Sequence, residues 1–230
     1  MNEEEAKTVQ EASRMASKAL DTGQKLGKFL NDVAGEGLKE LGGAFADWAR
    51  YVREKNLLSI HDKLEAIYKR RNIEGKTNPI SSRYAIPIIQ NASQEDNDLL
   101  QNLWAGLMAN STDPNKSIDP KKIYIDILSS LEPLDAKILK FFSSQGWKMI
   151  PGPHSDGFNL KKLTSNLNEP EKEIQLSLQN LARLGCIIDS YNSTWDSNES
   201  TSFGARVSDP GTTFRPTPLG FGLLEICSDE

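Results

Sequence analysis

The chain has 230 residues, of which 37% are hydrophobic and 26% are charged, and its formal net charge is -5 at pH 7. This length can bury at least one sizeable core and allows two small domains. No run of about 18 apolar residues is present, which excludes a conventional membrane-spanning helix, and two cysteines are too few for a disulfide framework. Because the chain starts with the acidic and polar stretch MNEEEAKTVQ, we expect no secretory signal peptide and a cytoplasmic protein with reduced cysteines.

Residues 1–75 predict a glycine-interrupted amphipathic helical region. Apolar residues recur with a drifting helical period over residues 2–48, but glycines such as Gly23 and Gly42 interrupt them. Each glycine inside a helix costs about 1 kcal/mol relative to alanine, so we expect several helical pieces that need a partner surface. Two interpretations stay open: an arm packed on the rest of the protein, or a segment that oligomerises or contacts a membrane peripherally. Lysines and glutamates along the whole stretch favour the packed arm.

A further helix is predicted over residues 49–75, where large apolar residues have helical spacing. Its polar side carries seven basic residues against four acidic ones, a local charge of +3 that could meet phosphate or lipid headgroups. A charge of this size is also typical of a solvated helix face. The residues expected on the buried side are Leu57, Leu58, Ile60, Leu64, Ile67 and Tyr68.

The central region is organised around a helix predicted over residues 93–110. Ser93 is the expected N-cap, and Asp96 stands three residues on, where it can complete a capping box. Glu95 adds negative charge at the positive end of the helix dipole. Asn110 and the Ser-Thr-Asp-Pro after it are expected to end the helix, because proline cannot continue it.

The same helix carries one wide apolar stripe, which makes it the expected organiser of the core. Trp104 lies in the middle of this stripe, and we expect it to be buried packing and not a ligand platform. A second core helix is predicted after Pro120, whereas Pro87 is expected to leave Ile86 extended or at a helix start. The stripe consists of Leu99, Leu100, Leu103, Trp104, Leu107 and Met108, and the second helix is expected to turn Ile123, Tyr124, Ile127, Leu128 and Leu131 inward.

Residues 132–230 show the element order of a winged helix-turn-helix-like domain. The sequence predicts a helix, a short helix, a longer helix that ends at Gly185, a strand at CIID, a long polar loop, a strand at FRPT and a final helix. The fold class that we expect for the whole chain is therefore mainly α, with a multi-helix N-terminal and central region and a C-terminal winged helix-turn-helix-like domain.

Winged helices often bind DNA, but the charges of this one disfavour it. A helix that reads DNA presents basic or amide side chains to the groove. The predicted third helix begins instead with Glu169, Glu171 and Glu173, which would oppose phosphates, and residues 146–230 carry 11 acidic against 7 basic residues. The candidate weak contacts to nucleic acid or to a partner are the scattered bases Lys161, Lys162, Arg183 and Arg206.

We find no motif for catalysis, for a cofactor or for a metal. The sequence contains no glycine-rich phosphate loop, no nucleophile elbow and no histidine paired with cysteine or serine in a recognisable arrangement. His61 and His154 are far apart and belong to no metal motif. We therefore expect a protein that is not an enzyme.

Two stretches of the chain, RYAIPIIQNASQEDNDLLQNLWAGLMANSTDP and IDPKKIYIDILSSLEPLDAKIL, resemble the bacterial abortive-infection alpha family. The stretch LGGAFADWARYVR before them and the winged-helix-like tail after them are also similar to that family. The resemblance makes residues 76–131 the family's central helical core and supplies no catalytic residues. The residues that match its motif are Ser93, Glu95, Asp96, Trp104 and Asn110.

The resemblance implies bacterial defence against phage by abortive infection. We expect the C-terminal half to sense a protein partner or a phage component, while the N-terminal helices rearrange, form a homo-oligomer or act on a membrane. Two alternatives remain open. One is a DNA-binding regulator that uses the winged helix, and the other is a scaffold or antitoxin-like partner with no activity alone.

Overall fold

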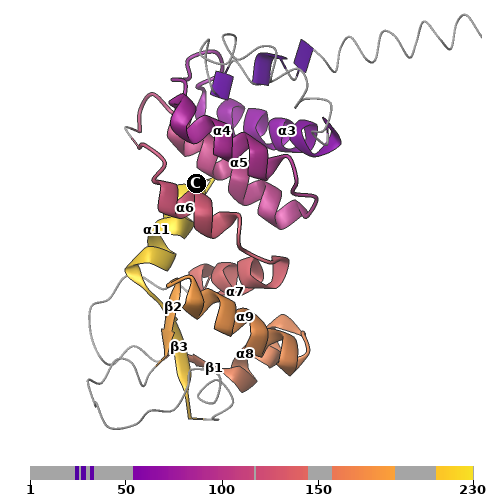
Figure 1. Ribbon diagram of the computed structural model, residues 1–230, viewed down its shortest axis with the longest axis vertical. Helices are drawn as coiled ribbons and strands as arrows, with labels where there is room; N and C mark the ends of the chain where they lie inside the picture. Colours follow the sequence, from indigo (N-terminus) through magenta and orange to yellow (C-terminus); the bar gives the residue numbers. More distant parts are fainter. Residues whose placement is uncertain are drawn as a thin grey trace, which may run out of the picture. The chain divides into compact units, whose positions relative to one another are not determined.

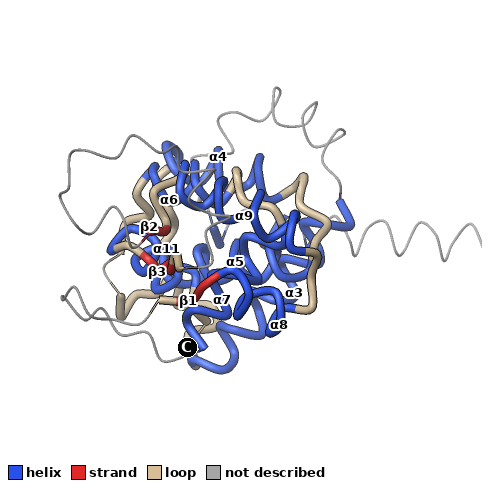
Figure 2. The backbone as a smooth tube through the Cα atoms, turned by 90° about the horizontal axis from the view of Figure 1, so that it is seen from below, coloured by secondary structure: helices blue, strands red, loops and turns tan. Residues whose placement is uncertain are grey.

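The computed structural model describes residues 24–25, 27–29, 32–33, 54–116, 118–144, 157–189 and 211–229 (Figure 1). These residues are mainly helical and include one small three-stranded sheet (Figure 2), which confirms the predicted mainly α class. The chain divides into two compact units. The first comprises Met1–Asp96, Trp104–Lys121 and Asp229, and the second comprises Asn97–Leu103, Lys122–Ser228 and Glu230.

Helix α3 (Glu54–Arg71) in the first unit carries the apolar face that its spacing predicts. Part of the N-terminal stretch packs on this helix, since the Phe29 ring meets the His61 ring edge-on, with 5.8 Å between centroids. Most of residues 2–48, including Gly23 and Gly42, lies outside the described residues. On α3, Leu57, Ile60, Leu64, Ile67 and Tyr68 are buried and Leu58 is half-buried.

Helix α4 (Ser82–Ala92) continues through Pro87, so the expected break or helix start at Ile86 is wrong. A proline inside a helix costs about 3 kcal/mol because it removes a backbone hydrogen bond and crowds the preceding turn. Ile88 and Ile89 directly after it are fully buried. Burial of two such side chains, at about 1.5–3 kcal/mol each, offsets that cost.

Helix α5 (Asp98–Thr112) begins later than predicted. Asn97 caps it, because its side-chain oxygen accepts the backbone N–H of Leu99 at 3.0 Å and of Leu100 at 3.3 Å. Ser93 is instead the C-cap of α4, and its hydroxyl donates to a carbonyl of that helix. The predicted N-cap is therefore wrong. Serine and asparagine cap almost equally well, so local preference alone could not choose between them.

Helix α5 stops within the Asn-Ser-Thr-Asp-Pro stretch that was expected to end it, although Asn110 itself still lies inside the helix. Asn110 is only 1% exposed, and its side-chain oxygen accepts a hydrogen bond from the Lys116 ammonium at 2.9 Å. The helix ends at Thr112, whose hydroxyl lies 2.7 Å from the hydroxyl of Tyr68. Burial raises the pKa of the Tyr68 phenol far above its usual value, so this contact stays a neutral hydrogen bond.

The second unit contains the sheet and the other helices that the structure describes. Its helices are α6 (Lys122–Leu128), α7 (Pro133–Ser144), α8 (Leu160–Leu167), α9 (Glu171–Arg183) and α11 (Pro218–Cys227), and its strands are β1 (Phe158–Asn159), β2 (Ile187–Asp189) and β3 (Thr213–Pro216). Strand β3 is central and pairs antiparallel with β1 and β2.

The helices and strands predicted for the C-terminal section are present. Gly185 ends α9 with a φ of +72°, a conformation that glycine adopts without a steric penalty. The two-residue strand β1 was not predicted, since so short a segment has no period. The predicted polar loop over residues 191–213 lies mostly outside the described residues.

One expected core position of α6 is wrong. Ile123 is 46% exposed, and Ile125 is buried in its place. A helix of seven residues makes only two turns, so its apolar period fits more than one face.

Candidate functional site

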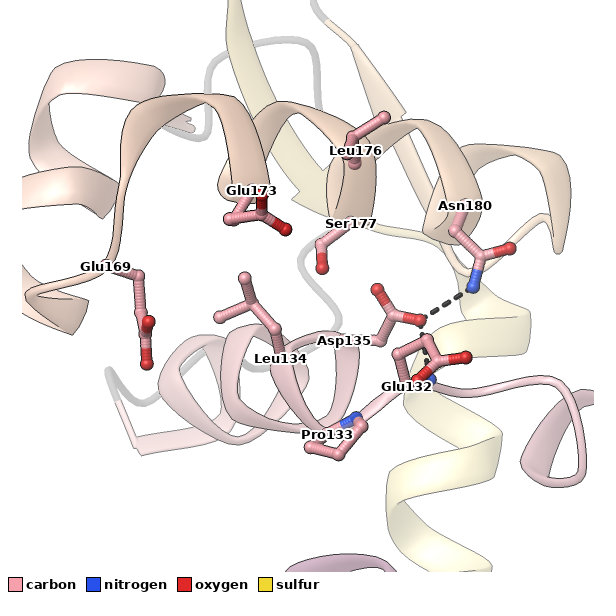
Figure 3. Close-up of a pocket in the computed structure, with 9 residues that line it drawn as sticks. All are labelled: Glu132, Pro133, Leu134, Asp135, Glu169, Glu173, Leu176, Ser177 and Asn180. Atoms are coloured by element: carbon pink, nitrogen blue, oxygen red, sulfur yellow. Dashed lines mark hydrogen bonds between the residues drawn. The ribbon is translucent and has the colours of Figure 1, made fainter.

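A cleft of about 550 Å³ lies in the second unit, between the start of α7 and one side of α9 (Figure 3). Helix α7 and the residue before it supply a continuous run of four residues to the cleft. Helix α9 supplies positions spaced three and four apart, which share one helix face. The lining residues are Glu132, Pro133, Leu134, Asp135, Glu169, Glu173, Leu176, Ser177 and Asn180.

Asp135 lies in this cleft with 1% of its surface exposed. Its Oδ2 atom accepts the backbone N–H of Glu132 at 2.8 Å, which is the reciprocal half of a capping box at the start of α7. The same oxygen accepts a hydrogen bond from the Asn180 amide at 2.6 Å. Two donors and the positive end of the helix dipole therefore stabilise the carboxylate on this side.

The second carboxylate oxygen of Asp135 is different. The Oδ1 atom is buried and accepts no hydrogen bond from any residue that the structure describes. In Figure 3 it points away from Asn180, toward the part of the cleft where the Ser177 hydroxyl lies. A buried acceptor that carries charge and lacks a donor costs more than about 1–3 kcal/mol, so this atom needs an explanation.

Asn180 holds the Asp135 carboxylate in place. Its amide also donates to the carbonyl of Ser130 at 3.1 Å, so both of its N–H groups are used. Its oxygen accepts from Arg183, at 2.7 Å from Nη2 and 3.2 Å from Nε. Because both N–H groups and the oxygen of the Asn180 amide form hydrogen bonds, the orientation of the Asp135 side chain is fixed before any ligand binds.

The rim of the cleft is acidic and partly apolar. Glu132 and Glu173 are exposed, and Glu169 is half-buried. The Lys137 ammonium lies 2.6 Å from the Glu169 carboxylate, so this rim already binds one lysine of the chain itself. Leu176 is 51% exposed, one of three large hydrophobic side chains exposed among the described residues.

The profile of a family described as abortive infection alpha matches residues 52–227. The chain belongs to the abortive infection alpha family. This confirms the resemblance drawn from the sequence, and the matched region includes both helices of the cleft. No curated protein and no solved structure matches the chain.

The five residues that carry the abortive infection alpha resemblance do not gather into a site. Ser93, Trp104 and Asn110 are buried, at 4%, 1% and 1% exposure, and each has a role in capping, packing or hydrogen bonding within the fold. Glu95 and Asp96 precede α5 and lie outside its first turn, where Asp98 is the acidic residue. The capping-box role predicted for Asp96 is therefore wrong along with that of Ser93.

The basic residues proposed as contacts lie on different elements of this abortive infection alpha protein. Lys161 and Lys162 lie exposed in the first turn of α8, and the Lys162 ammonium stands 4.5 Å above the ring of Phe158. Arg183 is exposed in the last turn of α9, where it bonds Asn180 beside the cleft. Arg206 lies outside the described residues.

The described part of the chain contains no group of three or more His, Cys, Asp or Glu side chains arranged to hold a metal ion. Cys186 and Cys227 are both buried thiols. Burial, with a contribution from the Asp135 charge, raises the pKa of Cys186 to about 12, and burial raises that of Cys227 further. Neither thiol is activated as a nucleophile. Among the described helices, none has both the length and the hydrophobicity that a membrane crossing requires.

Proposed function

We propose that this protein defends bacteria against phage by abortive infection, without enzymatic chemistry, and that its C-terminal half recognises a partner. The observation that carries the proposal is the family match over residues 52–227. The cleft adds support, since it combines a fixed buried carboxylate with an acidic rim and an exposed leucine. Such a surface suits a protein partner better than a reaction, because it presents no activated nucleophile.

The C-terminal section is proposed to be a winged helix-turn-helix-like domain used for protein interaction. The order α7, α8, α9, β2, β3 and the antiparallel pairing of β2 with β3 support this assignment. Glu171 and Glu173 stand in the first turn of α9, where a DNA reader would place donors for phosphates and bases. Their charge favours a basic protein partner over DNA.

In this proposal, partner binding at the C-terminal half is followed by a change in the N-terminal helices. These helices then rearrange, oligomerise or act at a membrane. Their glycines support the idea, because each lowers helix stability by about 1 kcal/mol and leaves the arm dependent on its packing surface.

Phage infection at two multiplicities tests the proposal. Cells that express the full chain are expected to form fewer plaques and to survive as a culture at low multiplicity. At high multiplicity the same culture is expected to collapse early, before phage release. Plaque counts and growth equal to those of cells with an empty vector, across a broad phage panel, would contradict the proposal.

A DNA-binding regulator is the second candidate, favoured by the exposed pair Lys161 and Lys162 at the start of α8. Duplex DNA binding that weakens with salt and is lost in Lys161→Ala, Lys162→Ala and Arg183→Ala variants would support it. No binding at low salt would remove it.

A further inference from the structure

The Oδ1 atom of Asp135 points to a specific ligand chemistry. The carboxylate is held rigidly by the Glu132 backbone and by Asn180, and both of those donors use Oδ2. The capping role at the start of α7 therefore accounts for the burial of Oδ2 and not for the burial of Oδ1. A charged, preoriented acceptor buried beneath the cleft is complementary to a cation that brings its own N–H donors.

The number of Asp135 carboxylate oxygens that can accept a further hydrogen bond decides whether a guanidinium or an ammonium fits better. A guanidinium binds a carboxylate best through two parallel hydrogen bonds, and it needs both oxygens for that. In Asp135 only Oδ1 accepts no hydrogen bond among the described residues. An ammonium is a compact donor that needs one oxygen from each acceptor, so a lysine fits this acceptor better than an arginine.

The walls of the cleft suit the rest of a lysine side chain. Leu134 is half-buried and Leu176 is 51% exposed, so together they offer apolar surface to the methylene stem. The Ser177 hydroxyl lines the cleft beside this acceptor and can accept a second N–H of the ammonium. Since Oδ1 itself is buried, a side chain that lines the cleft must move before an ammonium can reach it.

The acidic rim attracts basic segments electrostatically before they contact the cleft. Glu132 and Glu173 are exposed carboxylates, whereas the charge of the Glu169 carboxylate is balanced by the Lys137 ammonium 2.6 Å away. Carboxylates grouped around a cleft raise the local concentration of basic segments and speed their association.

We infer that the cleft between α7 and α9 is a docking site for a lysine side chain of a basic protein partner, with Asp135 as its buried acceptor and Leu134 and Leu176 as its walls. The inference deepens the proposed partner recognition and rests on that function for its biological meaning. The partner that it describes presents a lysine next to an apolar residue on an accessible segment.

Three short peptides, capped at both ends, probe the site. They share a leucine-containing sequence and differ only at the central residue, which is lysine, arginine or acetyl-lysine. Each is titrated into the nitrogen-15-labelled full-length protein and followed by NMR, which reports both affinity and location. The lysine peptide is expected to shift signals of residues 132–135 and 173–180. Acetylation removes the charge and is expected to weaken binding by about tenfold, the equivalent of one charge-assisted hydrogen bond.

Variants test the contribution of each part of the cleft. Glu173→Gln and Leu176→Ser change exposed side chains, so the fold is retained, and each is expected to weaken the lysine peptide about two- to fivefold. Glu171→Gln is the matched control, since it removes the same charge from an exposed residue of α9 that does not line the cleft. Asp135→Asn is expected to abolish binding, and its circular dichroism and melting temperature report whether the fold is kept.

Several results would overturn the inference. No shift with the lysine peptide at millimolar concentration would do so, as would equal binding of the acetyl-lysine peptide. Equal losses in Glu173→Gln and Glu171→Gln would show attraction to general negative charge and no docking site. Tighter binding of the arginine peptide would contradict the choice of ammonium. Peptide binding is measured without phage, so its failure is separable from a failure of the defence function.

Discussion

Gly220→Ala is expected to destabilise the second unit, although alanine is the better helix former. Gly220 lies in the first turn of α11 and packs against the backbone of Cys186. An added Cβ would collide with the Cys186 carbonyl oxygen and would lie 3.0 Å from its carbon, closer than ordinary van der Waals contact. That carbonyl cannot swing away freely, because it accepts the backbone N–H of Thr217 at 2.9 Å.

The expected change in the free energy of unfolding combines two costs and one gain. Overpacking against a fixed backbone group costs about 1–3 kcal/mol. Loss or distortion of the Thr217 hydrogen bond to Cys186 adds about 1 kcal/mol. Alanine in place of glycine returns up to about 1 kcal/mol of helix propensity. The net expectation is therefore a loss of about 1–3 kcal/mol in the free energy of unfolding.

Gly222→Ala is the matched control two residues along the same helix. There an added Cβ meets the hydroxyl end of the Tyr124 side chain, which can move, so we expect a change within about 1 kcal/mol of zero. Combining this variant with Tyr124→Phe is expected to remove what cost remains. Urea denaturation of the full chain, followed by far-UV circular dichroism, measures all these variants. A Gly220→Ala protein as stable as the wild type would contradict the predicted clash with the Cys186 carbonyl.

Three further predictions concern the helix caps, the two thiols and Asn180 in the cleft. Asn97→Ala is expected to cost about 1 kcal/mol in urea denaturation and Ser93→Ala less, and a larger loss for Ser93→Ala would contradict the assignment of the α5 cap. At pH 8, iodoacetamide should label Cys186 and Cys227 at least about a hundredfold more slowly in the folded than in the unfolded protein, because burial raises the pKa of both thiols. The labelling rate of the folded protein should increase as the pH rises toward these pKa values. Rapid labelling of the folded protein at pH 8, detected by mass spectrometry, would contradict the prediction. Asn180→Ala should lower the melting temperature, by the equivalent of about 1–3 kcal/mol, because it removes a hydrogen-bond donor from the buried Asp135 carboxylate. An unchanged melting temperature would contradict the role of Asn180 in holding that carboxylate.

Hydrophobic periodicity predicts the long elements of this chain well. Helix α3 turns toward the core the large residues that its spacing indicates, and Trp104 in α5 is fully buried, as expected. Where a stretch offers several equivalent local signals, periodicity does not decide where a helix begins or ends. Ser93 and Asn97 are both good caps, and the segment around Pro87 becomes helical because burial of Ile88 and Ile89 outweighs the local penalty.

The cleft could not be predicted in the same way, because it depends on pairing between distant segments. Asp135 and Asn180 are 45 residues apart in sequence, and nothing in the pattern of either helix indicates that their side chains meet. The sequence does place Glu169 and Glu173 near the start of α9, and their charge indicates that DNA is disfavoured. It does not indicate that a buried carboxylate of α7 lies beside them.

Phage infection of cells that express variants of the cleft is the decisive test of partner recognition through the cleft. A chain with both Glu173→Gln and Leu176→Ser is compared with Glu171→Gln at equal protein levels and high phage multiplicity. We expect that the control culture collapses before phage release, as the wild type does, while the culture with the cleft variant collapses later and releases more phage. Early collapse of both cultures at the same time would contradict recognition through the cleft.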